Sequence, residues 1–191
     1  MASVDHPADR RGLRWGGLDP VQKLIVVIVP LGLLHHADHV GRADHSSWPF
    51  RSELGPFTFT LLIYPVLVVA FLARRGSWLR AAALGIVALF TLVAHTLIEP
   101  PGQIYGTWAN NLSTDAPLYT VDREHMHNLF DREMPLLGNL ATILSVVLTG
   151  LLLIAAFQAI RDTRTVRAAA PADINTHPSH QEWSDRGLSG A

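Results

Sequence analysis

The stretch Leu61-Leu62-Ile63-Tyr64-Pro65-Val66-Leu67-Val68-Val69-Ala70 is apolar on every side of a helix. A surface helix of a soluble bundle would carry a polar stripe at helical spacing, and this stretch has none. It belongs to one of four apolar blocks, which cover residues 21–40, 57–73, 79–98 and 136–160. Each block is close to the ~20 residues that cross a hydrocarbon core of about 30 Å. The sequence therefore predicts an all-α, integral membrane four-helix bundle over residues 20–162.

The distribution of arginines predicts the orientation of these helices. Arginines with few acids nearby occur in the N-terminal tail, in the second connection and in the C-terminal tail (Arg10, Arg11 and Arg14; Arg74, Arg75 and Arg80; Arg161, Arg164 and Arg167). The positive-inside rule then puts both termini in the cytoplasm of a bacterial-type plasma membrane, with the loop 100–134 outside. Residues 1–19 and 163–191 are rich in Pro, Ser, Asp, Arg and Ala, which predicts disordered cytoplasmic tails.

The loop 100–134 is too long to be a simple connection between helices. Loops of this length are usually functional or disordered, and this one carries too many aromatic residues and leucines for plain disorder. From Thr120 to Arg132 its pattern predicts a short amphipathic helix on the mouth of the bundle. Polar residues inside the helices, such as Thr60, Tyr64 and Ser145, are expected to form hydrogen bonds between helices.

Composition excludes several classes of function. The chain has no cysteine, which rules out disulfides, zinc ribbons and thiolate-bound copper or iron–sulfur sites. Its net charge is −1, so the basic footprint of a nucleic-acid-binding protein is absent.

Ionisable side chains gather at the ends of the two apolar blocks that run outward. The first block closes with Leu33-Leu34-His35-His36-Ala37-Asp38-His39, and the third closes with His95 and Glu99. Such residues are costly in a membrane and are a functional-site hypothesis by default. In the predicted topology all of them lie on the extracytoplasmic side, together with His125 of the long loop. The sequence therefore predicts a metal site there, with ligands drawn from His35, His36, His39, His95, Glu99 and His125.

Helical geometry limits which side chains of the first block can meet on one ion. At ~100° per residue, His35 and His39 point about 40° apart on one face. His36 lies about 60° beyond His39, and Asp38 lies about 60° to the other side of His35. Either the first two bind one ion while His36 and Asp38 support them, or the strip serves two ions. Arg42 follows Asp38 at i+4, so an ion pair is the alternative role of this carboxylate.

His95 and Glu99 are also four residues apart and share a face. Glu99 is expected to act as a metal ligand or as a general base on metal-bound water. A carboxylate at the C-terminal end of a helix opposes the macrodipole, so it needs a cationic partner, which a metal or an arginine would supply. His125 and His127 would point apart in a helix, so at most one enters the site, and membership of His45 is open.

The histidine motif also carries two resemblances. The run His35-His36-Ala37-Asp38-His39-Val40-Gly41-Arg42, followed by Trp48-Pro49-Phe50, resembles a group of small bacterial four-helix membrane proteins without an assigned activity. This resemblance covers the first helix and its following loop, and it implies no reaction. The histidine spacing is similar to that of the boxes of membrane fatty-acid desaturases and alkane hydroxylases, which bind two irons. Those enzymes have more histidines, in boxes of a different order and on the cytoplasmic side, so membership does not follow.

Three functions remain open from the residues. The first is a metalloenzyme that acts on an apolar or lipid substrate near the outer leaflet, with Glu99 or Asp38 as ligand or proton carrier. Oxygen-dependent oxidation by iron or copper is favoured, and a zinc-type hydrolysis is the alternative. The second is a haem-b electron carrier with one histidine of the first helix and His95 as axial ligands. The third is a metal carrier or accessory subunit, working as a homo-oligomer or with a membrane partner.

Overall fold

The computed structural model describes residues 17–42, 56–111 and 128–169, and all regular structure within these ranges is helical. Helix α1 spans Pro20–Arg42 and α5 spans Pro135–Ala169. Helix α3 spans Trp78–Val93 and continues as a single π-turn, Ala94–Ile98 (η3). These three segments, the third taken as Trp78–Ile98, are long and apolar enough to cross a membrane.

The second predicted span is built from two kinds of helix. A 3₁₀ helix, Pro56–Leu62 (η2), leads into α2, Ile63–Leu72. The ten residues of α2 rise only about 15 Å, but a 3₁₀ helix rises ~2.0 Å per residue, so the two together cover about 29 Å. The 3₁₀ start therefore lets a short apolar segment reach nearly the thickness of a hydrocarbon core.

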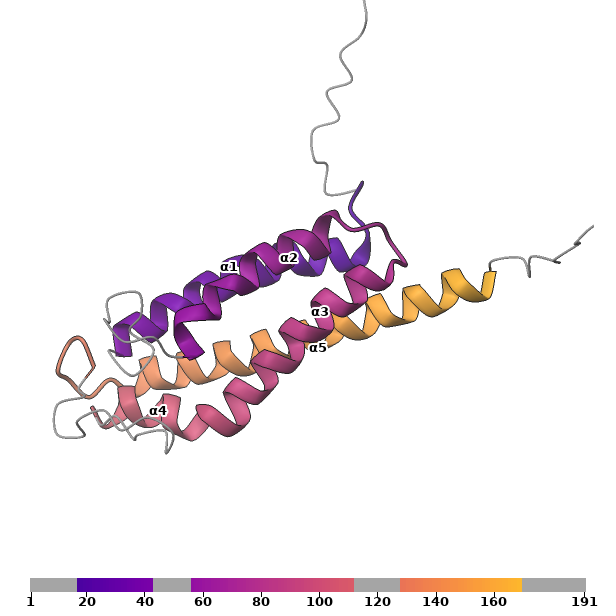
Figure 1. Cartoon of the computed structure of the whole chain (residues 1–191). Helices are drawn as coiled ribbons and strands as arrows, with labels where there is room; N and C mark the ends of the chain where they lie inside the picture. Colours follow the sequence, from indigo (N-terminus) through magenta and orange to yellow (C-terminus); the bar gives the residue numbers. More distant parts are fainter. Residues whose placement is uncertain (1–16, 43–55, 112–127, 170–191) are drawn as a thin grey trace, which may run out of the picture.

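The helices pack as two antiparallel pairs. Figure 1 shows α1 beside α2, and α3 beside α5. Helix α1 also contacts α5, and α2 also contacts α3, so the four helices form a closed ring. A short helix, α4 (Pro101–Ala109), packs on α5 at the end of the bundle where α1 and α3 end.

Two expectations about the ends of the elements are corrected here. Helix α5 continues to Ala169, so residues 163–169 are helical and do not belong to a disordered tail. Residues 128–132 form a turn and not the end of the amphipathic helix expected over 120–132; the remainder of that stretch, 120–127, lies outside the described residues. The buried side chain of Asn128 stabilises this turn, because its Nδ2 donates to the carbonyl oxygen of Arg132 (2.7 Å) and its Oδ1 accepts from the backbone N–H of Phe130 (3.1 Å). These bonds replace the i→i+4 pattern of a helix.

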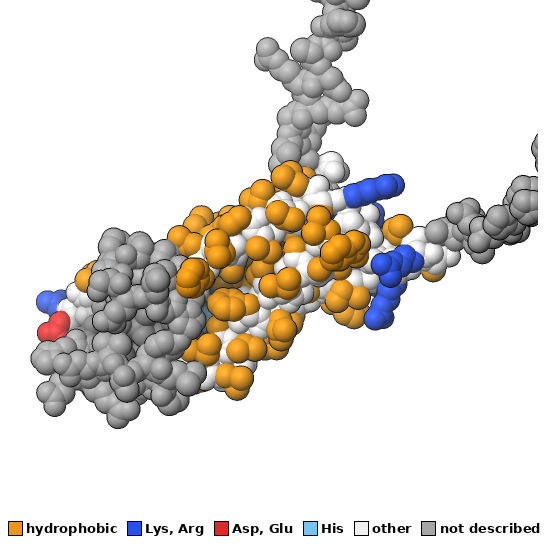
Figure 2. All heavy atoms as spheres, viewed as in Figure 1, with side chains coloured by type: hydrophobic (Ala, Val, Ile, Leu, Met, Phe, Trp, Pro, Cys, Tyr) orange, Lys and Arg blue, Asp and Glu red, His pale blue; other side chains and the backbone are white. Residues whose placement is uncertain are grey.

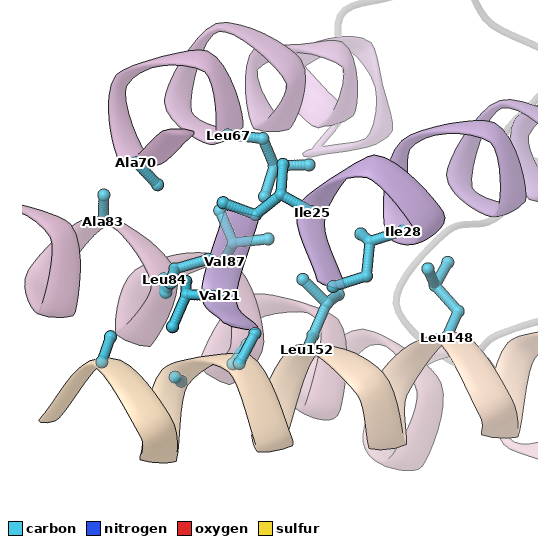
Figure 3. Close-up of a cluster of buried hydrophobic side chains, with 14 residues drawn as sticks. Val21, Ile25, Ile28, Leu67, Ala70, Ala83, Leu84, Val87, Leu148 and Leu152 are labelled. Atoms are coloured by element: carbon cyan, nitrogen blue, oxygen red, sulfur yellow. The ribbon is translucent and has the colours of Figure 1, made fainter. Parts of the chain in front are cut away.

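The core lies in the half of the bundle away from α4. Helices α1, α2, α3 and α5 all contribute to it, for example with Ile28, Leu67, Val87 and Leu152 (Figure 3). Alanines of α5 let this helix approach its neighbours closely, as small residues do in membrane bundles. The face drawn in Figure 2 carries a broad belt of apolar side chains, and most of the Lys and Arg side chains visible on it lie at the end where α5 ends. Such an exposed apolar belt is what a bilayer would cover.

A buried arginine closes the bundle at the end opposite α4. The Arg80 side chain, 2% exposed, donates from Nε to the carbonyl oxygen of Ala70 (3.0 Å), near the C-terminus of α2. Its Nη1 donates to Asp19 Oδ2 (2.6 Å) just before α1. The backbone N–H of Asp19 donates to Gln22 Oε1 (3.1 Å), and the backbone N–H of Gln22 donates to Asp19 Oδ1 (2.9 Å). This is the capping-box arrangement. One side chain thus joins the ends of three helices.

Burial raises the pKa of Asp19, but the hydrogen bond from Arg80 and the backbone N–H bonds outweigh it, so its pKa lies below the usual value. The stability that Asp19 contributes is therefore fully present at pH values above the pKa that its carboxyl group has in the unfolded chain. It is lost as the pH falls through the lower pKa of the folded state.

Replacing Arg80 should destabilise the bundle strongly. Arg80→Met leaves Asp19 without its cation and the carbonyl oxygen of Ala70 without the donor Nε. Removing one partner of a buried ion pair costs about 3–5 kcal/mol, and the partial exposure of Asp19 puts this pair towards the lower end. Denaturant unfolding in a mild detergent, followed by circular dichroism, measures the loss. The matched control is Arg75→Met, because Arg75 pairs with Asp162 at the surface and its side chain is 61% exposed. Equal unfolding midpoints for the two variants would show that Arg80 does not hold this end together.

Candidate metal centre

Two histidines at the end of α1 point inward on one face. His35 is 4% exposed and His39 is 7% exposed, and their Nε2 atoms lie 3.0 Å apart. They are one helical turn apart, so the common face follows from the geometry of α1. The sequence predicted this pairing.

The third histidine comes from the π-turn that ends α3. His95 is buried in η3, and its Nε2 lies 2.9 Å from Nε2 of His35. A π-turn inserts one extra residue into a helical turn, and such turns are frequent at functional sites. One ring nitrogen from each of His35, His39 and His95 lies within 4.8 Å of the other two. We call these three residues the histidine trio.

The trio suits a transition-metal ion by distance. Metal–nitrogen bonds of about 2.0–2.1 Å at tetrahedral angles separate the nitrogen atoms by about 3.3 Å. The two Nε2 separations in the trio are 3.0 and 2.9 Å. The ring nitrogens of the remaining pair, His39 and His95, lie within 4.8 Å of each other, so an ion bound to all three requires the rings to shift. Three imidazoles would leave the remaining coordination position open.

His95 is oriented by a threonine of α5. Its Nδ1 lies 2.8 Å from Oγ1 of Thr149, and that hydroxyl donates to the carbonyl oxygen of Ser145 (2.8 Å). Because the hydroxyl proton goes to Ser145, Thr149 accepts the proton of His95 Nδ1. The lone pair of neutral His95 is then on Nε2, which faces the trio. Metal-binding histidines usually donate their other N–H to such a partner.

His35 is held by its Nε2 atom alone. Its Nδ1 is buried and has no hydrogen-bond partner within the described ranges. Nε2 is close to both other members of the trio. His35 is therefore the central residue of the cluster, and its polar contacts all lie on the side where an ion would sit.

His39 differs from the other two members because an arginine contacts it. Arg42 Nη2 donates to His39 Nδ1 (2.8 Å). An arginine has no lone pair to offer, so Nδ1 is the acceptor and the proton of neutral His39 is on Nε2. His39 can bind an ion through Nε2 only in its other neutral tautomer, which requires Arg42 to turn away and the ring proton to move from Nε2 to Nδ1. His39 is therefore the member of the trio that must rearrange before it can bind an ion.

The two carboxylates of the site, Asp38 and Glu99, both pair with Arg42. Arg42 is fully buried, and its Nε donates to Asp38 Oδ2 (2.9 Å). Its Nη1 donates to Glu99 Oε1, and its Nη2 lies 3.4 Å from Glu99 Oε2. Asp38 also accepts from Trp108 Nε1 of α4 (2.7 Å). The structure thus places Asp38 and Glu99 in an ion-pair network, and the arginine supplies the cation that Glu99 needs.

Glu99 still lies close to the trio, since its Oε2 is 3.6 Å from Nε2 of His39. His36 does not join the trio. Its Nδ1 lies 2.8 Å from the carbonyl oxygen of Gly32 and 2.9 Å from the Tyr64 hydroxyl, and its Nε2 lies 3.3 Å from Thr60 Oγ1. His125, like His45 and His127, lies outside the described residues.

Several residues of the site carried little or no signal in the sequence. Thr149 and Trp108 were not singled out, because a threonine in an apolar helix and a tryptophan in a loop are common. Tyr64 was expected only to link helices. Arg42 was recognised as a partner of Asp38 at i+4, but its contact with Glu99, 57 positions away, requires the tertiary structure.

A cavity of about 40 Å³ adjoins the trio. A single water molecule needs roughly 10–15 Å³ of cavity volume, so a cavity of about 40 Å³ admits a few small atoms beside the imidazoles. Most of the exposed wall of the cavity is apolar. It is formed by side chains of α1, α2, α3 and α5, among them Leu67, Val87 and Leu148.

Comparison of the chain with protein-family models, with curated proteins and with solved structures found no match. The geometry of the site therefore carries the functional argument by itself.

Removing the hydroxyl that orients His95 should weaken metal binding. Thr149→Val deletes the partner of His95 Nδ1, and loss of such a partner typically costs about 10–100-fold in affinity. Competition with a chelator of known affinity measures the change. The matched control is Thr163→Val, because Thr163 lies on the same helix, is also 9% exposed and bonds to the carbonyl four residues earlier in the same way. Equal affinities for both variants would contradict the role of Thr149.

The position of Glu99 predicts that it is dispensable for holding the ion. Glu99→Gln keeps an oxygen that accepts from Arg42, so the purified variant should retain its metal stoichiometry while unfolding at a lower denaturant concentration. Elemental analysis and an unfolding curve on the same sample test both parts. Loss of metal to the extent seen in His95→Ala would show that Glu99 is itself a ligand.

Proposed function

We propose that this protein is an integral membrane metalloenzyme that binds one transition-metal ion through His35, His39 and His95. The observation that carries the proposal is the convergence of three buried imidazoles from two separate helices on one point. Buried polar groups are costly without partners, and three neutral rings facing one another satisfy each other poorly. A cation bound by all three Nε2 atoms resolves this conflict.

Oxygen-dependent oxidation is the chemistry that the surroundings favour. Three nitrogen ligands without thiolate suit iron or copper, which supply redox chemistry with dioxygen when bound. Hydrolysis would need a general base on a metal-bound water, and the best candidate, Glu99, is occupied by Arg42. The apolar cavity wall would also hold little water. Dioxygen is the oxidant in this proposal, and any reaction that needs further electrons takes them from a membrane partner.

The residues of this chain have separate tasks in that scheme. His35 and His95 present lone pairs, and Thr149 fixes the ring of His95. His39 would bind through Nε2 once its ring proton has moved to Nδ1 and Arg42 has turned away. The apolar wall excludes bulk water, so that an apolar substrate rather than water would fill the cavity.

A single metal ion fits the packing of the histidine trio better than a haem group does. A haem would need its porphyrin ring between two axial imidazoles, whereas the rings of His35 and His95 touch through atoms 2.9 Å apart. Zinc would fit the three nitrogen ligands as well as iron or copper does. We propose the topology with both termini in the cytoplasm, which puts the site towards the extracytoplasmic side.

Metal content tests the proposal directly. Detergent-purified protein should contain about one equivalent of iron or copper by elemental analysis. His35→Ala and His95→Ala should each lose most of it, because two imidazoles hold an ion far more weakly than three. His36→Ala is the matched control and should keep its metal, since His36 bonds to Gly32, Thr60 and Tyr64 instead. Metal-free protein, even after incubation with each ion, would exclude the enzyme, and zinc alone would favour hydrolysis.

A further inference from the structure

A polar wall faces the cavity beside the histidine trio. The cavity is lined by His36, Thr60 and Tyr64, which come from α1, η2 and α2, and by the three members of the trio. Apart from Thr91 and Glu99, the rest of the lining is apolar. The side chains of His36, Thr60 and Tyr64 therefore form one group of hydrogen-bonding side chains in the cavity wall, in addition to the trio.

Hydrogen-bond directions assign a donor to this wall. The Nδ1 of His36 lies 2.8 Å from the carbonyl oxygen of Gly32, which can only accept, so Nδ1 carries the proton. The Tyr64 hydroxyl, 2.9 Å from the same Nδ1, is then also an acceptor of that N–H. Its own proton has no acceptor among the contacts that the structure describes for Tyr64. The O–H of Tyr64 is thus available to donate to an oxygen atom in the cavity.

The depth of the wall in the membrane restricts the kind of oxygen. His36 lies six residues before the end of α1, which corresponds to about 9 Å along the helix. A charged group at this depth in a hydrocarbon core is expensive. A neutral hydroxyl or carbonyl oxygen fits, whereas a carboxylate or phosphate does not.

The size of the cavity restricts the rest of the molecule. About 40 Å³ accommodates an oxygen and a few carbons but not a whole chain. Phe90 and Ile63 also line the cavity, and Phe90 is 39% exposed on the apolar outer surface. An apolar body can therefore lie in the bilayer against α2 and α3 while its oxygen-bearing end enters between these helices.

We propose that the cavity binds the end of a long-chain alcohol, aldehyde or ketone, with its oxygen accepting from the Tyr64 hydroxyl. This inference deepens the proposed function and rests on it for the chemistry at the ion. Tyr64 is a substrate-binding residue that places the oxygen-bearing carbon beside the trio. The chain remains in lipid, and its recognition depends on one hydrogen bond and on the absence of charge.

Photo-crosslinking of the full-length protein in detergent tests the inference. The probe is a long-chain alcohol with a diazirine near the hydroxyl end, and the competitors are the unlabelled alcohol and the carboxylic acid of equal chain length. The alcohol should compete and the acid should not. Tyr64→Phe should weaken binding of the probe about 3–10-fold, as expected for one hydrogen bond. Tyr105→Phe, on α4 and outside the cavity lining, is the matched control.

Two results would overturn the inference. One is equal competition by the acid, and the other is unchanged binding by Tyr64→Phe. If Tyr64→Phe does not fold, mass-spectrometric mapping of the crosslinks in the unsubstituted protein takes its place as the test. Crosslinks at Ile63 or Phe90 are expected, and crosslinks confined to the outer face of α5, for example at Val146 and Ile154, would also overturn it. Metal content of the same samples reports separately on the proposed metal site.

Discussion

The guanidinium group of Arg42 is the interaction on which the arrangement of the site depends. It is fully buried at the end of α1 and bonds to Asp38 on its own helix, to Glu99 beyond η3 and to His39. A buried charge is tolerated only when it is paired. The ends of α1 and α3 must therefore meet at Arg42, and that meeting brings His95 next to His35. The arrangement of the histidine trio is a consequence of this ion-pair network as much as of the histidines themselves.

Arg80 performs the same structural task at the other end of the bundle. It joins Asp19 before α1 to the last carbonyl groups of α2. Between the two arginines the helices pack through leucines, valines and alanines, which define contact but not register, because lipid tails are as apolar as these side chains. Directional bonds at both ends supply the register that apolar packing leaves open. The depth of the trio in the bundle is set by that register.

The three histidines of the trio are chemically unequal because their second ring nitrogens meet different surroundings. Thr149 holds His95 with its lone pair inward, His35 has no further described partner, and Arg42 holds His39 in the opposite protonation pattern. In the proposed metal site, binding of an ion would therefore be linked to movement of a ring proton of His39 and of Arg42. The cavity beside the trio is small and mostly apolar, so the proposed chemistry would take place away from bulk water. In the same proposal the polar wall at Tyr64 would select among apolar substrates.

The sequence by itself determined the helical, membrane-type character of the chain and the inward pair His35 and His39. These properties depend on residue type and on helical periodicity within one segment, which the sequence contains completely. It also indicated the pair of Asp38 with Arg42, since both lie on one helix. Only the tertiary structure decided that His95 completes the trio, that Glu99 pairs with Arg42, and that Thr149 orients a ring. Periodicity states which residues share a face of a helix, but not how that helix is rotated and shifted against its neighbours. That rotation is set by the π-turn of η3, the 3₁₀ start of α2 and the buried arginines, which act together only in the folded bundle.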